Sequence, residues 1–376
     1  MAPTTTSGQD DVKNLSAIQN GVSIVICCHN SSKRLPEALR HLALQAGTEN
    51  IPWEVIVVDN ASIDDTSNAA CRSWPSDAPV PLRVVSEPHA GLSHARFRGI
   101  RESKYELVSL VDDDNWVASD WVARVYNVLS SKHSVAACGG IGDPVFENPG
   151  TPPWFWRYAS AFAVGPQGRA EGFVSRNRAF LYGAGLTVRR SAWQTLTAQG
   201  FVAILSDRKG RSLTAGGDSE LCHAFVLAGW ELWYDPDLKF RHFLPAERLT
   251  WSYLRRLHRG FGAAATWLDL YKLQLNPPVN VAFRRVPLPK PVCAAIRRTW
   301  AFKVYSIART LFSEHRTVWK HRRDPAWEGR AEILRLEWEL GRAIYLLKVA
   351  FVYDRTLWNL QKAPWVAKTG RAILEP

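Results

Sequence analysis

Three consecutive carboxylates directly follow a short apolar run, and their position is the strongest chemical signal in the chain. Asp112, Asp113 and Asp114 come after residues 107–111, Leu-Val-Ser-Leu-Val, which we expect to form a strand. Asp112 and Asp114 are two residues apart and can point to the same side. Mg²⁺ and Mn²⁺ prefer oxygen ligands, often carboxylates together with substrate phosphates. The alternative is an acidic turn before a helix near Ser119, but the strand end favours a metal site.

Two further polar segments follow expected strands. Asp59 and Asn60 come after residues 55–58, Val-Ile-Val-Val. A carboxylate there can accept hydrogen bonds from a nucleobase or a ribose, although Asp and Asn also favour plain turns. Gly91 would let backbone approach a ligand closely, and Arg96 on the first turns of the next helix could reach a base or a phosphate. Taken alone, that helix is equally explained by a solvated arginine on an amphipathic surface.

Three later residues could take part in catalysis. Asp218 and Glu220 follow Gly216 and a second glycine at the expected start of a helix, where a carboxylate could act as a general base toward a substrate hydroxyl. We prefer Asp218 as that base and expect Glu220 to orient its neighbours, with helix capping as the alternative for both. His242 follows an apolar segment. It is a candidate metal ligand because carboxylates upstream would leave a coordination sphere unfilled.

The pattern of apolar runs indicates the scaffold that positions these residues. Short runs at 22–28, 55–58, 82–85, 107–111 and 135–138 alternate with helical patterns at 36–45, 65–74, 91–102 and 120–129. Such alternation is typical of a mostly parallel, Rossmann-like α/β sheet covered by helices on both faces. Ligands bind beyond the carboxyl ends of its strands, where His29, Asn30, Asp59 and Asp112 fall.

The second half of the chain is less regular. Residues 144–180 are rich in Pro, Gly and aromatics, and we expect a loop-rich segment that caps the site. Residues 181–188 and 230–234 are candidate strands. From residue 249 the pattern is mainly helical, with a proline-rich break at 276–291 and its clearest helix at 328–353.

The positive charge is concentrated in the last third. The net charge is +12, yet residues 241–376 hold 25 Lys and Arg against 10 Asp and Glu, while residues 1–240 hold 22 against 25. A basic segment with many Trp, Tyr and Phe suits an anionic surface, although a solvated helical face is the simpler alternative. The six cysteines form no CxxC pair and are expected to be reduced thiols in a cytoplasmic protein. No signal peptide and no apolar run of membrane-spanning length is visible.

Taken in order, the motifs resemble family 2 glycosyltransferases, which have the GT-A fold and build bacterial polysaccharides and other glycans. The matching segments are VSIVICCHN, WEVIVVDNASIDDT, EPHAGLSHARFRGI, LVSLVDDDNW, GGDSEL and RHFLPAERLTWSYLRRLHRG. The resemblance implies a GT-A domain over 21–262, with a nucleotide half at 21–140 and an acceptor half at 141–262. Residues 1–20 would be a flexible lead, and 263–376 a basic, aromatic-rich helical extension.

The resemblance also implies roles for individual residues. Asp59 would contact the base, Asp112 the ribose, and Asp114 with His242 a Mn²⁺ or Mg²⁺ ion in a DxD motif. Asp218 would deprotonate the acceptor, so the sugar would be transferred with inversion. The residues implied to bind the nucleotide sugar are Cys28, His29, Asn30, Asp59, Asn60, Gly91, Arg96, Asp112 and Asp113. Those implied to contact phosphates are Arg255, Arg256 and Arg259.

The partners expected are a nucleotide sugar, most commonly of UDP, and a glycan or lipid-linked saccharide acceptor. We expect peripheral attachment to the inner face of the cell membrane through the basic extension. A catalytically inactive, glycosyltransferase-like scaffold at the membrane is the alternative, which the complete set of Asp112, Asp114 and Asp218 disfavours. A nucleic-acid binder lacks RRM, KH or zinc-finger motifs. A nucleotidyltransferase or a dehydrogenase would need a glycine-rich phosphate loop after the first strand, and none is present.

Overall fold

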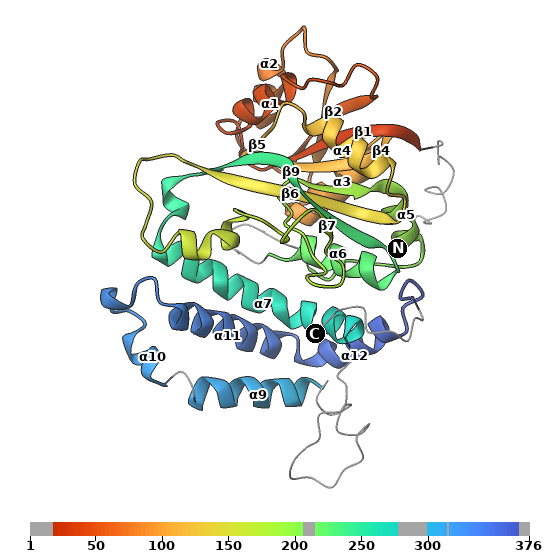
Figure 1. Cartoon of the computed structure of the whole chain (residues 1–376). Coiled ribbons are helices and arrows are strands. Elements are labelled where there is room, and N and C mark those ends of the chain that lie inside the picture. Colours follow the sequence, from red (N-terminus) through yellow and green to blue (C-terminus); the bar gives the residue numbers. More distant parts are fainter. Residues whose placement is uncertain (1–17, 206–214, 277–298, 314–315, 368–376) are drawn as a thin grey trace, which may run out of the picture.

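The first part of the fold is a parallel sheet unit (Figure 1). The structure is a computed structural model that describes residues 18–205, 215–276, 299–313 and 316–367. The first elements are β1 (Gln19–Cys28), α1 (Leu35–Ala43), β2 (Trp53–Asn60), α2 (Thr66–Ser73), β3 (Leu82–Glu87), α3 (Leu92–Glu102) and β4 (Tyr105–Asp112). β1 lies between β2 and β4 and is parallel to both, and β3 is parallel to β2. The parallel α/β unit expected from the sequence is confirmed here.

The strands beyond β4 make the complete sheet mixed. The elements that follow are β5 (Asn115–Val117), α4 (Trp121–Ser130), β6 (Val135–Phe146), the 3₁₀ helix η2 (Trp156–Phe162), β7 (Gly172–Phe173), β8 (Leu186–Arg189), α5 (Arg190–Ala198), α6 (Gly217–Leu227) and β9 (Glu231–Leu244). The strand order is β3-β2-β1-β4-β8-β6-β9-β5, with β7 on β9. β8 is antiparallel to β4 and β6, and β9 is antiparallel to β5. His242 therefore lies within a strand and not after one.

The apolar runs are continuous because the central strands are buried on both faces. Ile24 and Ile26 of β1 belong to the core beneath α1 and α4, whereas Val25 belongs to the core beneath α3 and α6. All three side chains have no exposed surface. The period-two alternation of a strand thus feeds two separate cores, and this fixes the register of β1 in the sheet.

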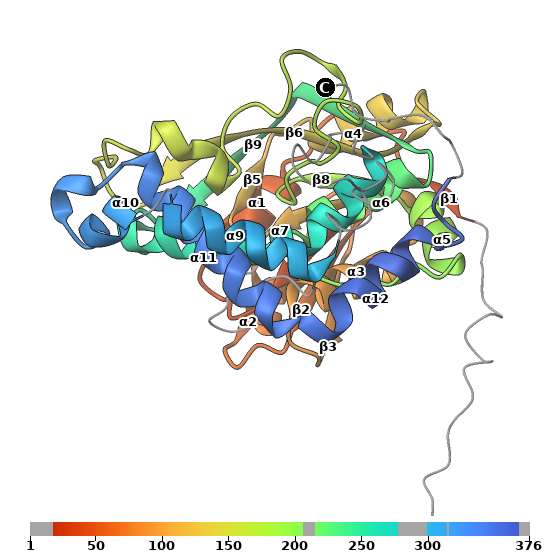
Figure 2. The same ribbon diagram turned by 90° about the horizontal axis from the view of Figure 1, so that it is seen from below.

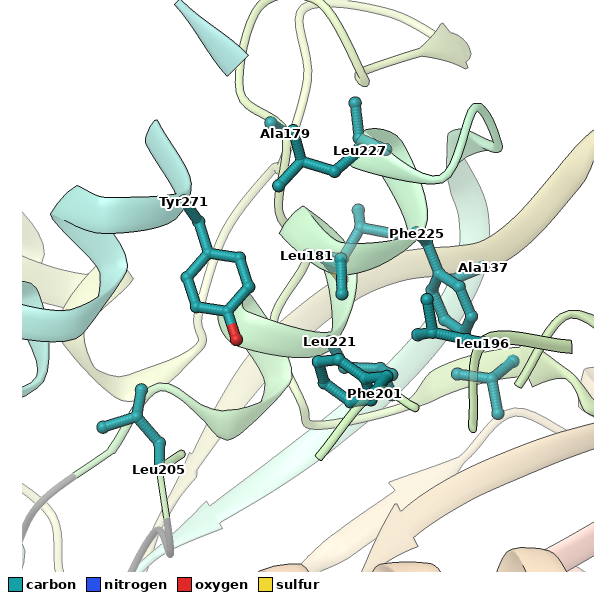
Figure 3. Close-up of a cluster of buried hydrophobic side chains, with 14 of the residues drawn as sticks. Ala137, Ala179, Leu181, Leu196, Phe201, Leu205, Leu221, Phe225, Leu227 and Tyr271 are labelled. Carbon is teal, nitrogen blue, oxygen red and sulfur yellow. The ribbon is translucent and has the colours of Figure 1, made fainter. Parts of the chain in front are cut away.

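The helix α6 is the centre of the larger core (Figure 3). Leu221, Phe225 and Leu227 of α6 pack with Leu181 from the preceding segment and with Tyr271. Phe225 is fully buried and Tyr271 is 1% exposed. Because α6 is held from several sides, the residues of its first turn, including Asp218, have a fixed position relative to the sheet.

The C-terminal helices form a layer beside the sheet (Figures 1 and 2). They are α7 (Trp251–Leu275), α9 (Trp300–Ser313), α10 (Arg316–His321), α11 (Ala331–Lys348) and α12 (Ala350–Gln361). The boundary expected between residues 262 and 263 falls in the middle of α7. That helix contacts α6 on one side and α11 on the other, so it joins the two regions. In the described part of the chain no helix is both long enough and apolar enough to cross a bilayer.

Two glycines allow α7 and α11 to pack backbone against backbone. A Cβ added at Gly262 would lie 1.9 Å from the backbone oxygen of Trp338, and one added at Gly341 would lie 1.9 Å from that of Arg259. Any larger residue would force the helices apart. The interface is closed by Glu337, which is 2% exposed and accepts hydrogen bonds from Arg255 and Arg259.

Some of the residues discussed from the sequence lie outside the part of the chain that the structure describes. Residues 1–17 of the expected N-terminal lead, the proline-rich break from residue 277 onward and Cys293 lie outside it. The other five cysteines are free thiols, with Cys71 exposed and the rest buried or half-buried.

We predict that Gly341→Ala destabilises the protein although alanine favours helices by about 1 kcal/mol over glycine. The new methyl group has no room against the α7 backbone, and overpacking of this kind costs about 1–3 kcal/mol. The midpoint of urea unfolding should fall, while Glu332→Ala at an exposed position of α11 should leave it unchanged. An unchanged midpoint in Gly341→Ala would show that the two helices do not pack this closely.

Candidate active site

The carboxyl ends of β1, β2 and β4 open into a cavity of about 970 Å³, and α7 forms its opposite wall. This volume lies within the usual range for small-molecule sites. Both glycine-led segments of the sequence, at Gly91 and Gly216, also reach it. The sequence-predicted residues that line it are Cys28, His29, Asn60, Gly91, Arg96, Asp112, Asp113, Asp114, Asp218 and His242.

Asp114 is held by a cation and a histidine from outside its own strand. One of its oxygens accepts a hydrogen bond from Arg248 Nη1 at 2.8 Å, and the other lies 3.5 Å from Nε2 of His242. The pairing of β5 with β9 sets Asn115 opposite His242 and so fixes this approach. Burial would raise the pKa of Asp114, but His242 and Arg248 outweigh burial and hold the pKa well below its usual value. Asp114 is therefore a buried carboxylate that stays ionised.

The other two carboxylates of the triplet have different surroundings. Asp113 accepts a hydrogen bond from Arg34 Nη2 at 2.8 Å and another from the hydroxyl of Ser31, which ties β4 to the start of α1. Asp112 lacks such a close cation, and burial raises its pKa to about 6 although Arg96 opposes the shift. Additional positive charge or a hydroxyl donor next to Asp112 would relieve this unfavourable burial.

The donor set suits a divalent metal that is bound largely through substrate phosphates. Asp114 offers carboxylate oxygens, His242 offers an imidazole nitrogen, and Nδ1 of the histidine is buried without a hydrogen bond partner among the described residues. In the described part of the chain, no three His, Cys, Asp or Glu side chains gather as a metal site by themselves. Mg²⁺ is usually bound by only one or two protein carboxylates together with phosphate oxygens of the substrate. The residues present therefore fit such an ion.

Asn60 acts mainly as a tie between neighbouring loops. Its amide nitrogen donates to the backbone oxygens of Glu87 and His89 at 3.0 and 2.7 Å, and its amide oxygen accepts from the backbone N–H of Gly91 at 2.8 Å. Gly91 has φ 141°, a conformation that side chains disfavour. Asn60 therefore positions Gly91 and the start of α3 at the rim of the cavity.

Of the remaining residues expected to bind the base, some line the cavity and others make hydrogen bonds to neighbouring loops outside it. Cys28 and His29 line the cavity, and His29 Nδ1 lies 2.8 Å from the backbone oxygen of Asn60. Asn30 and Asp59 do not line it. Asn30 accepts a hydrogen bond from the backbone N–H of Ile63 at 2.9 Å. Asp59 accepts one from the backbone N–H of Ser62 and one from the hydroxyl of Ser67 in α2.

Asp218 faces the cavity from the first turn of α6. Its two oxygens accept backbone hydrogen bonds from Gly183 and Ser219, each at 2.7 Å. A Cβ at Gly183 would lie 2.5 Å from Nη2 of Arg96 and 3.0 Å from Oδ2 of Asp218, so glycine is needed where these two side chains approach each other. The arrangement presents one carboxylate, oriented by backbone and close to a guanidinium, to the cavity.

Glu220 is a structural residue of the core. It has no exposed surface, and it accepts hydrogen bonds from the backbone N–H groups of Ile204 and Leu205 at 2.8 Å and from the Tyr271 hydroxyl at 2.6 Å. It joins α6, α7 and the segment after α5, and it does not line the cavity. Its effect on Asp218 is therefore indirect.

The arginines expected to contact phosphates lie elsewhere. Arg255 and Arg259 are bound to Glu337 of α11, Arg256 lies 5.8 Å from the ring of Tyr253, and none of the three lines the cavity. Besides Arg96, the arginines and lysines that do line it are Arg34, Arg178, Arg248 and Lys272, none of which the sequence pattern indicated. Arg248 lies within the quoted segment that begins at Arg241, and its distance of six residues from His242 was the available signal.

Comparison with known proteins agrees with this geometry. The model of the family "Glycosyl transferase family 2" matches residues 23–196. The succinoglycan biosynthesis protein ExoM of Rhizobium meliloti (strain 1021) is 25% identical over 243 residues, which are 64% of this chain and 72% of that protein. The glycosyltransferase GlyG of Streptococcus pneumoniae serotype 4 is 29% identical over 118 residues, 31% of this chain and 38% of that protein.

A solved structure supports the fold. The mannosyltransferase PcManGT of Pyrobaculum calidifontis, in complex with GDP-Man and Mn²⁺, aligns with a TM-score of 0.51 over 88% of each chain at 16% identity. Identity this low shows a shared fold and nothing more specific. The family match therefore identifies residues 23–196 as a family 2 glycosyltransferase domain, and the shared fold is that of the GT-A glycosyltransferases.

Proposed function

We propose that the chain transfers a sugar from a nucleotide sugar, with UDP as the first candidate nucleotide, to a glycan or lipid-linked saccharide, with inversion at the sugar carbon. The observation that carries this proposal is that the Asp112–Asp114 triplet and Asp218 face one cavity from two different elements. One set can hold the diphosphate, and the other can act on the acceptor.

In this proposal the donor end of the cavity is built around β4. Asp112 accepts a hydrogen bond from the ribose, which replaces the water that burial removed. Asp114 and His242 would hold Mn²⁺ or Mg²⁺, which would supply positive charge to stabilise the departing diphosphate. Arg248, already beside Asp114, takes the phosphate role first assigned to Arg255, Arg256 and Arg259. Cys28 and His29 line the pocket for the base.

Asp218 is the proposed general base at the acceptor end. Backbone N–H groups orient both of its oxygens, so the carboxylate is placed before the acceptor arrives. The proton of the acceptor hydroxyl moves to Asp218 as the oxygen attacks the donor carbon, and attack on the side opposite the leaving group inverts that carbon. Arg96 lies near the same carboxylate.

The biological setting proposed is polysaccharide or glycoconjugate biosynthesis. The name of the relative ExoM, a succinoglycan biosynthesis protein, supports this setting. The cavity of about 970 Å³ lies at the upper end of the usual range for small-molecule sites, which suits a site for two substrates.

We propose further that the C-terminal helices attach the enzyme to the cytoplasmic face of an anionic membrane. Four apolar side chains, here called the stripe, are exposed: Ile344 and Leu347 of α11 by 47 and 61%, and Phe351 and Trp358 of α12 by 99 and 58%. The basic residues Lys348 and Arg355 fall between them, Lys362 follows Trp358, and all three are exposed. Exposed aromatics between cations match the interface of an anionic bilayer.

We expect Asp218→Asn to slow sugar transfer by about 10²–10⁴-fold, the usual contribution of a general base. Nucleotide binding should be retained, because Asp218 serves the acceptor end of the cavity. Thermal stability should fall less than in Glu220→Gln, because Asp218 is half-buried and water can satisfy the backbone N–H that loses its acceptor. The measurement is release of nucleoside diphosphate from a panel of nucleotide sugars in the presence of saccharide acceptors.

Glu220→Gln is the contrasting variant. Its amide would place a donor against backbone N–H groups, so this change should lower the melting temperature and leave the remaining folded enzyme active. Wild-type transfer rates in Asp218→Asn would contradict the assignment of the base.

We also expect the double variant Phe351→Ser, Trp358→Ser to bind anionic vesicles at least tenfold more weakly than wild type. Burying one large apolar side chain contributes about 1.5–3 kcal/mol. Vesicle sedimentation at low salt measures the effect, with Ile63→Ser, at a 93% exposed apolar position outside the stripe, as the matched control. Equal binding by both variants would remove the stripe from the membrane proposal.

A further inference from the structure

Two cations of the cavity are not neutralised by the protein. Arg34 and Arg248 line the cavity in ion pairs with Asp113 and Asp114. Arg178 and Lys272 line the same cavity, and neither forms a salt bridge with any residue in the described ranges. The donor end is therefore close to charge balance, whereas these two cations leave an excess of positive charge elsewhere in the cavity.

Arg178 is fixed in place by aromatic rings. Its guanidinium carbon lies 4.2 Å from the ring centroid of Phe180 and 4.5 Å from that of Tyr182. Its Nε is buried, and among the described residues no group accepts a hydrogen bond from it. Cation–π contacts orient a guanidinium but do not satisfy its in-plane N–H donors, of which only Nη1 makes a long hydrogen bond, to the backbone oxygen of Gln167 at 3.4 Å, among the described residues. A half-buried arginine of this kind is ready to bind an anion.

His223, near Arg178 and its aromatic neighbours, has a ring nitrogen that can accept a hydrogen bond. Its side chain is on the cavity lining although the residue is only 1% exposed. Nδ1 lies 2.5 Å from the backbone oxygen of Ser219, and a carbonyl oxygen only accepts, so Nδ1 carries the proton. Nε2 then has a free lone pair and no hydrogen bond partner in the described part of the molecule.

The imidazole stays neutral, so this lone pair persists at neutral pH. Burial first, and then the charge of Lys272, lower the pKa of His223 to about 4. The ring also stacks near Phe180, with centroids 6.4 Å apart, which links it to the Arg178 group. A neutral Nε2 can accept a hydrogen bond from a sugar hydroxyl.

The cluster adjoins the proposed base. His223 is one turn beyond Ser219 on α6, whose backbone N–H holds Asp218. Tyr182 directly precedes Gly183, whose N–H holds the other oxygen of Asp218. Whatever molecule presents a hydroxyl to Asp218 therefore lies next to the aromatic and cationic side chains.

We infer that Arg178, Phe180, Tyr182, His223 and Lys272 form a subsite for an acceptor sugar that carries a negative charge, either a carboxylate or a phosphate. The cations would bind the anionic group, the aromatic rings would contact the sugar ring, and His223 would accept from a hydroxyl. This inference rests on the proposed function, because the subsite belongs to the acceptor only when Asp218 is the base.

The test uses the full chain saturated with the nucleoside diphosphate that it binds, titrated with three small sugars. Methyl glucuronide carries a carboxylate, glucose 6-phosphate a phosphate, and methyl glucoside no charge. We expect at least one charged sugar to bind about tenfold or more tightly than the neutral one, which corresponds to about 1.4 kcal/mol. The better of the two identifies the anion.

Variants test which residues cause the preference for a charged sugar. Arg178→Gln and Lys272→Gln should each reduce the preference for the charged sugar and leave nucleotide affinity unchanged, while Arg256→Gln, the same charge change outside the cavity, should alter neither. Lys272 is exposed, so its variant remains informative even if Arg178→Gln folds poorly. The NMR signals of the His223 ring, assigned with the variant His223→Gln, should shift when a sugar binds and should not shift when the nucleotide alone binds.

The experiment distinguishes failure of the proposed subsite from failure of the proposed function. Equal affinity for all three sugars, or a charge preference that survives both glutamine variants, would overturn the subsite while nucleotide binding stands. Failure of the wild type to bind any nucleoside diphosphate would instead reject the proposed function itself.

Discussion

Burial of three adjacent carboxylates at the end of β4 is the constraint on which the rest of the site depends. Charges removed from water are tolerated only when cations or hydrogen bond donors approach them. The fold brings Arg34 from the start of α1 to Asp113, and His242 and Arg248 from β9 and the turn after it to Asp114. Asp112 remains the least compensated, and burial raises its pKa to about 6.

This requirement explains why the long strand β9 and the helix after it are part of the catalytic unit. β9 must reach β5 to place His242, and the turn that follows must place Arg248 before α7 begins. α7 then closes the cavity along one side and packs against α6, which carries Asp218. The C-terminal helices hold α7 in turn through Gly341 and Glu337. The extension therefore supports the site that it follows in sequence.

The sequence predicted those parts of the site that depend on local pattern. Apolar runs ending in polar residues placed Asp112 to Asp114, His29 and Asn60 at one edge of a sheet, and a glycine pair before a helix indicated Asp218. It failed where the partner is distant along the chain. Nothing near Arg255 and Arg259 reveals that Glu337 takes both of them.

Other differences between the sequence-based predictions and the structure also have physical causes. Glu220 resembles a site residue in sequence, because a carboxylate two positions after Asp218 gives no sign that it is fully buried and bonded to Tyr271. The boundary at residue 262 followed the end of the stretch that resembles family 2 glycosyltransferases, whereas α7 runs through that point as one helix. Arg178 and Lys272 stand alone in the sequence, and only the fold places them on one cavity.

The most direct test of the central claim is calorimetric binding of a panel of nucleoside diphosphates, with and without Mn²⁺, to the wild type and to Asp114→Ala. If the carboxylates of β4 form a donor site, one nucleotide should bind the wild type more tightly with Mn²⁺, and this metal-dependent gain should vanish in the variant. Absence of any nucleotide binding to the wild type, or a metal-dependent gain that survives in Asp114→Ala, would contradict the account.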